Sequence, residues 1–113
     1  MNFSIEGKSE FERILTILQI GLLTALENNL ISIEESEGYL FNPYILRILQ
    51  NHKINSNIID VIHLGCELED VKSLLPDKLL DNIARLKKDS IKILGSLEKS
   101  NIPVEKLIRE IID

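Results

Sequence analysis

One run of residues constrains the fold of this 113-residue chain more than any other, because it is apolar on almost every side of a helix. Between Ile14 and Leu26 it holds only isoleucine, leucine and alanine, apart from one glycine and the polar residues Thr16, Gln19 and Thr24. A helix with so narrow a polar stripe has to be surrounded by other elements. The run is too short to cross a bilayer, which needs about 20 apolar residues. We therefore expect a buried central helix.

Start and stop signals divide the rest of the chain into further helices. Serine followed three residues later by glutamate forms a capping box, and this pattern occurs at Ser9 with Glu12 and at Ser32 with Glu35. Asn42 before Pro43 is typical of another helix start, and Asn55 or Ser56 can cap the next one. The expected helices cover residues 10–28, 32–41, 43–51, 56–65, 77–99 and 103–112, with a short turn over residues 69–75. The sequence predicts an all-α, compact single domain over residues 1–113, with five to six helices around the central one.

Composition and charge limit the partners of such a domain. Hydrophobic residues make up 44% of the chain and charged residues 27%, as in an ordinary globular protein. The single cysteine allows no internal disulfide and the first residues have no signal-peptide pattern, so we expect a cytoplasmic protein. The net charge of −5 disfavours nucleic acid and anionic membranes. A basic protein is the easier partner.

The basic residues do not form a convincing nucleic-acid site. They gather on the helix expected over residues 77–99, where Asp77, Asp81 and Asp89 interrupt them and cancel most of the field. A helix-turn-helix over residues 44–64 would present a recognition segment, residues 56–64, that has no lysine or arginine for phosphates. We expect no contact with nucleic acid and none with a membrane.

Residues with catalytic or metal-binding chemistry are few and poorly grouped. His63 and Cys66 lie three residues apart on a helix, but a zinc site needs three or four ligands. A cysteine nucleophile would need a base and an orienting group, which the same helix places badly. Glu67, Glu69 and Asp70 fit the start of a helix, where carboxylates favour the helix dipole. We expect no catalytic residue, no metal site and no cofactor.

Three of the five aromatic residues fall beside three acids, which makes one segment a candidate binding surface. Tyrosine combines an apolar body with a polar tip, and such residues with a charged rim are common at protein interfaces. The predicted partner-binding residues are Glu34, Glu35, Glu37, Tyr39 and Tyr44. In the alternative interpretation, Phe41 fills the core, the tyrosines pack half-buried beside it, and the glutamates only solubilise a helix start.

The end of the chain offers a second candidate surface. After Pro103 the apolar residues repeat at helical spacing, at Val104, Leu107, Ile108, Ile111 and Ile112. A helix this short needs a surface to lie on, either in its own domain or in a second subunit. Ile108, Ile111 and Ile112 are therefore the predicted dimer seam of an alternative function, that of a small homodimeric regulatory or assembly protein.

Two stretches of the sequence resemble a known family. Residues 32–43, SIEESEGYLFNP, and 64–71, LGCELEDV, are similar to a family of short all-helical bacterial proteins of unknown function. That resemblance implies no activity and no catalytic residues. In size, acidity and helical content the chain also resembles small bacterial immunity proteins that mask a basic toxin. We expect a non-enzymatic protein that binds another protein, and an enzyme is the third hypothesis.

Overall fold

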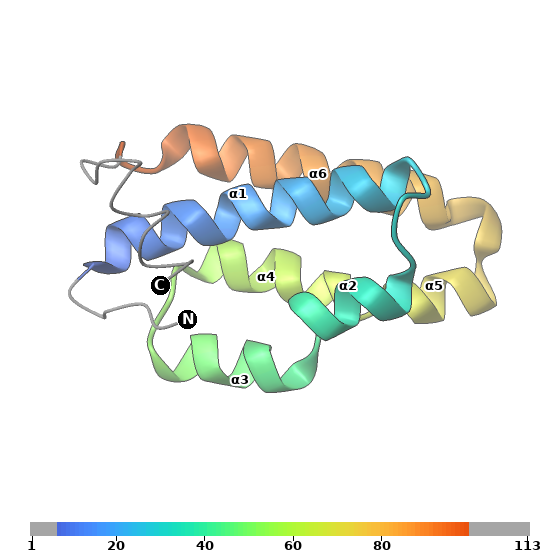
Figure 1. The fold of residues 1–113 in the computed structure, drawn as a ribbon, viewed down its shortest axis with the longest axis horizontal. Coiled ribbons are helices and arrows are strands. Elements are labelled where there is room, and N and C mark those ends of the chain that lie inside the picture. The colour runs from blue at the N-terminus through green and yellow to red at the C-terminus, as the bar shows by residue number, and fades with distance from the viewer. Residues whose placement is uncertain (1–6, 100–113) are drawn as a thin grey trace.

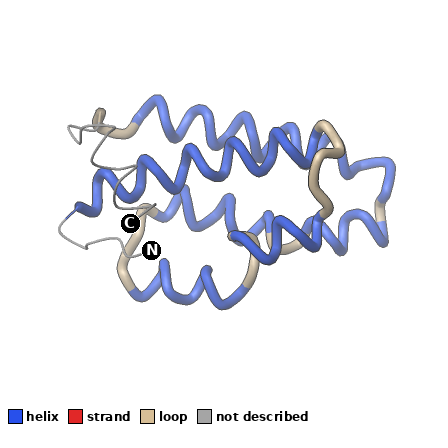
Figure 2. The backbone as a smooth tube through the Cα atoms, viewed as in Figure 1, coloured by secondary structure: helices blue, strands red, loops and turns tan. Residues whose placement is uncertain are grey.

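The computed structural model describes residues 7–99, and all regular elements in that range are helical. Figure 2 shows these helices joined by short loops. They are α1 (Lys8–Glu27), α2 (Ile33–Tyr39), α3 (Pro43–Asn51), α4 (Ser56–Gly65), α5 (Leu68–Leu74) and α6 (Leu79–Ser96), with a 3-10 turn, η2 (Pro76–Lys78), before α6. The all-α prediction is therefore confirmed.

The predicted count of five to six bundle helices is not matched. Only α1, α3, α4 and α6 are longer than two turns, with 20, 9, 10 and 18 residues. Both α2 and α5 have 7 residues, because Pro43 and Pro76 follow them closely and prolines disfavour a helical residue before them. The helix expected over residues 103–112 lies outside the described residues.

The helices form a long pair with the shorter helices on one side of it (Figure 1). α1 and α6 run antiparallel along their length, so that the start of α1 and the end of α6 lie at the same end of the molecule. α4 packs against both of them, and α3 packs against α4. α2 contacts α1 and α5 at the other end. All six helices contribute to one aliphatic core.

The helix α1, which the sequence predicted to be buried all round, is buried on one side only. Thr16 and Gln19 are fully buried, whereas Ile17 and Leu18 are 51% and 43% exposed. The Gln19 amide Nε2 donates to the Ile58 carbonyl at 3.1 Å, and its Oε1 lies 3.4 Å from the Ser90 hydroxyl. A buried polar side chain is tolerated when it is hydrogen-bonded, and Gln19 joins α1 to α4 and α6 in this way. The prediction that other elements surround this helix on every side is therefore wrong for the described residues, because Ile17 and Leu18 stay exposed.

The helix starts follow the predicted caps with one exception. The Ser32 hydroxyl accepts from the Glu35 amide at 3.0 Å, and Asn42 Oδ1 accepts from the Ile45 amide at 2.8 Å, as expected. The capping box at Ser9 is wrong, because α1 begins two residues earlier than expected, at Lys8 after Gly7. Glu12 instead accepts from the Asn55 amide at 2.6 Å, a contact that ties α1 to the start of α4.

Candidate functional site

The helix α2 separates an apolar inner side from an acidic outer side. Ile33 and Ser36 are buried, and the Ser36 hydroxyl donates to the Ile33 carbonyl at 2.7 Å, so that its polarity is satisfied within the helix. Glu34 and Glu35 occupy the first turn and are exposed. Carboxylates are favourable there, near the positive end of the helix dipole. The outer side of α2 is therefore negatively charged at little cost to the helix.

Both tyrosines point away from the core. Tyr39 is 58% exposed and Tyr44 is 68% exposed, whereas Phe41 between them is completely buried. The Tyr39 hydroxyl donates to Glu35 Oε2 at 3.0 Å, and this hydrogen bond to a nearby negative charge raises the pKa of Tyr39. Phe41 fills the core as the alternative interpretation expected, but the tyrosines do not pack half-buried beside it.

A carboxylate from another helix joins this group. A hydrogen bond with Glu69 of α5 raises the pKa of Glu37, with further contributions from partial burial and from the charges of Glu69 and Glu34. We call the set Glu34, Glu35, Glu37, Tyr39, Tyr44 and Glu69 the acidic tyrosine face. From the sequence, Glu69 is expected only at a helix start. Contacts between α2 and α5 bring it to Glu37 across 32 positions, and no local pattern signals this.

The charge of the acidic tyrosine face is not balanced by an ion pair within residues 7–99. The two ion pairs found in that range lie elsewhere, between Lys87 and Glu27 at 3.0 Å and between His63 and Glu67 at 3.7 Å. Carboxylates that repel one another lower the stability of a fold, and a positively charged partner would relieve that repulsion. The acidic tyrosine face therefore carries negative charge that no ion pair in the described fold offsets.

Phe41 and Gly65 are in close contact beneath the segment that carries the tyrosines. The end of α4 comes so close to Phe41 that a Cβ atom built at Gly65 would lie 2.5 Å from the Phe41 ring. Only glycine fits at such a distance without a shift of the ring. This contact brings together residues 32–43 and 64–71, the two stretches that carry the family resemblance. Tyr39 and Tyr44 thus lie in sequence on either side of Phe41, which packs tightly against α4.

The surroundings of Cys66 do not favour the reactive thiolate that the enzyme hypothesis needs. Burial raises the pKa of the Cys66 thiol, and the nearby charges of Glu37 and Glu67 raise it further. A nucleophilic cysteine needs the opposite shift, because the thiolate is the reactive form. His63 is exposed and contacts Glu67. Within residues 7–99 there is also no group of three or more side chains that could hold a metal ion.

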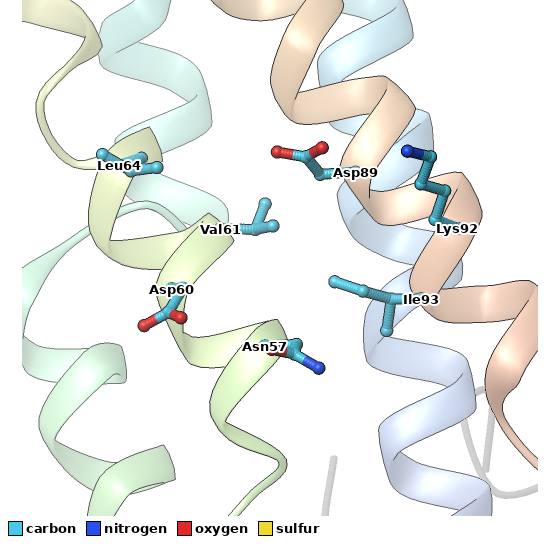
Figure 3. Close-up of a pocket in the computed structure, with 7 residues that line it drawn as sticks. All are labelled: Asn57, Asp60, Val61, Leu64, Asp89, Lys92 and Ile93. Carbon is cyan, nitrogen blue, oxygen red and sulfur yellow. The ribbon is translucent and has the colours of Figure 1, made fainter.

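A groove that is open to solvent lies between α4 and α6 (Figure 3). Val61 and Ile93 face each other across it, while Asp60, Asp89 and Lys92 stand along its edges. Its volume of about 270 Å³ is below the range of most small-molecule sites, and it is open to solvent. Charges of both signs line it, which gives it no clear preference for a charged ligand.

Two further sequence predictions concern parts of the chain beyond this site. The dimer seam of Ile108, Ile111 and Ile112 lies outside the described residues. No helix between residues 7 and 99 is long and apolar enough to cross a membrane.

Comparison with known proteins gives a family match without a known activity. The model of a family described as "Protein of unknown function (DUF3969)" matches residues 6–109, which is nearly the whole chain. No curated protein matches the chain, and no solved structure does. The match agrees with the resemblance to an uncharacterised family and gives no support to the likeness to immunity proteins.

Proposed function

Because this chain belongs to the DUF3969 family of proteins of unknown function, its role has to be inferred from its own surface, and we propose that it binds a basic protein through the acidic tyrosine face. The observation that carries the proposal is the exposure of Tyr39 and Tyr44, 58% and 68%, on a segment whose carboxylates form no ion pair in the described fold. Exposed aromatic side chains with a charged rim supply both contact area and orientation.

The electrostatics of the face support a cationic partner. Glu37 and Glu69 are close enough to raise the pKa of Glu37, so the fold brings two acidic side chains together that disfavour each other's charged form. A lysine or arginine from a partner would remove this repulsion on binding, and the gain would add to the ordinary attraction between opposite charges. The net charge of −5 would also speed the encounter with a basic protein.

In its sharpest form, the proposal is an immunity-type role in the cytoplasm, in which the chain masks a basic toxin without catalysing a reaction. The raised pKa of the Cys66 thiol favours this non-enzymatic role over a cysteine enzyme. The alternative is a homodimeric regulatory or assembly protein that uses Ile108, Ile111 and Ile112 as its seam. An enzyme is the third hypothesis, for which the geometry of His63 and Cys66 gives the weakest support.

Charge reversal with a matched control tests the proposal. The test variant carries Glu34→Lys, Glu35→Lys and Glu37→Lys, and the control carries Asp77→Lys, Asp81→Lys and Glu98→Lys. Each variant replaces three acids by lysine, so both change the net charge equally. The control residues are exposed, and Asp77 and Asp81 lie at helix starts, as Glu34 and Glu35 do. Each full-length protein is used to capture partners from a lysate of the source organism, and the captured proteins are identified by mass spectrometry.

We expect the unmodified chain and the control variant to capture a basic protein that the test variant does not capture. Its binding should weaken as salt is added, because salt screens exposed charges. Capture of the same proteins by all three baits would contradict the proposal. Self-association that none of the substitutions affects would favour the homodimer instead, and sedimentation of each bait measures it.

A further inference from the structure

The side of α1 that faces away from the core carries no charged residue between Arg13 and Glu27. Its outward residues are Ile14, Ile17, Leu18, Gly21 and Ala25, which we call the outer face of α1. Ile17 and Leu18 are 51% and 43% exposed, and Gly21 is exposed as well. Outward faces of helices in soluble proteins are usually polar, and a contiguous exposed apolar patch marks a surface that another element covers.

Gly21 points to what kind of element covers this face. A glycine in the middle of a helix costs about 1 kcal/mol relative to alanine. Nothing in the described structure explains it, because a Cβ built at Gly21 meets no atom within 4 Å. A second helix that crosses α1 at this point would explain it, since the missing side chain lets two backbones approach closely. Small residues serve this purpose where helices pack tightly.

The chain itself provides an occupant of suitable length. Residues 100–113 lie outside the described residues, and they follow α6, whose end lies beside the start of α1 (Figure 1). The apolar spacing over residues 104–112 predicts a helix of about 14 Å. The stretch of α1 from Ile14 to Gly21 is about 10 Å long at the same rise. Residues 100–103 add a span of up to about 13 Å between the end of the described chain and this segment.

We propose that residues 104–112 cover the outer face of α1 in the same chain, with their apolar side on Ile17 and Leu18. A nine-residue helix is not stable alone in water, and it gains stability when its apolar side is buried. A short tether keeps it at an effective concentration in the millimolar range, which favours its own α1 over that of a second copy. This inference is independent of the acidic tyrosine face, which lies on other helices.

Hydrogen exchange of the full-length protein tests this docking. Backbone amides of residues 104–112 should exchange at least about tenfold more slowly than in an unstructured chain. Ile17→Asp places a charge on the outer face of α1 and should return them to the unprotected rate. Leu74→Asp is the matched control, because Leu74 is 77% exposed on α5, and it should leave the protection unchanged. The amide of Ile62, a fully buried residue, shows whether each variant is still folded.

Gly21→Phe is a second variant that fills the crossing point without adding charge, and we expect it to remove the protection as well. Protection of residues 104–112 that is the same in the unmodified protein and in both variants would overturn the proposal. Unprotected amides in the unmodified protein would also overturn it. So would protection seen only at concentrations where sedimentation detects a dimer, since a second copy would then be the occupant.

Discussion

The inner and outer sides of residues 32–44 use neighbouring positions for opposite purposes. On the inner side, Ile33 and Phe41 are buried in the core, and the Phe41 ring packs against Gly65. On the outer side, Tyr39 and Tyr44 are more than half exposed, and Tyr39 lies beside the acid Glu35. The difference indicates that stability depends on the inner side, whereas the outer side is free to serve binding. Substitutions on the two sides should therefore have separable effects.

Phe41→Ala is the substitution with the largest expected effect on the inner side. It removes a fully buried aromatic ring, and such truncations cost about 3–5 kcal/mol of unfolding free energy. Denaturant unfolding followed by circular dichroism measures the loss. If the variant lost less than about 1 kcal/mol, Phe41 would not anchor the segment and the contrast between the two sides would fail.

Gly65→Ala tests the joint between Phe41 and α4. Alanine usually favours a helix, but its Cβ would lie 2.5 Å from the Phe41 ring, and overpacking typically costs about 1–3 kcal/mol. We expect a net loss of stability in the same unfolding experiment. The Phe41→Leu substitution makes room there, so the double variant should be more stable than the sum of the two single losses predicts. Additive losses would mean that the two residues do not interact.

Glu37→Gln should stabilise the fold slightly, whereas the substitutions at Phe41 and Gly65 should destabilise it. The raised pKa of Glu37 means that the folded state binds the proton more tightly than the unfolded chain, so its contribution to stability is present at low pH and is lost as pH rises through the folded pKa. Glutamine removes the like charge at neutral pH and should stabilise the fold by ~0.3 kcal/mol. Unfolding at pH 7 and pH 4 checks this. A gain that persists at pH 4 would contradict repulsion as its cause.

Some parts of the fold could be predicted because they depend on residues close in sequence. The caps at Ser32 and Asn42 act over three positions, and they are where the sequence places them. The buried face of α1 could not be predicted, because apolar residues lie on both sides of that helix. Gln19 faces the core only because α4 and α6 offer it the Ile58 carbonyl and Ser90. Such a choice is made by the rest of the fold.

The same limit applies to the candidate site. The local cluster of acids and aromatic residues could be recognised, and its tyrosines are exposed, while their role in binding stays a prediction. Its sixth member, Glu69, could not be recognised, because it reaches Glu37 through the packing of α5 on α2. The burial of Phe41 belongs to the alternative interpretation. Each of the two readings of this segment therefore describes one side of it.

The most direct test of a separate binding side is to compare stability and partner capture for one variant, Tyr39→Ala with Tyr44→Ala. Exposed positions away from special contacts usually change stability by no more than about 0.5 kcal/mol each. We predict that the double variant unfolds at nearly the same denaturant concentration as the unmodified chain and no longer captures the basic partner. Full retention of that partner by the folded double variant would contradict the account.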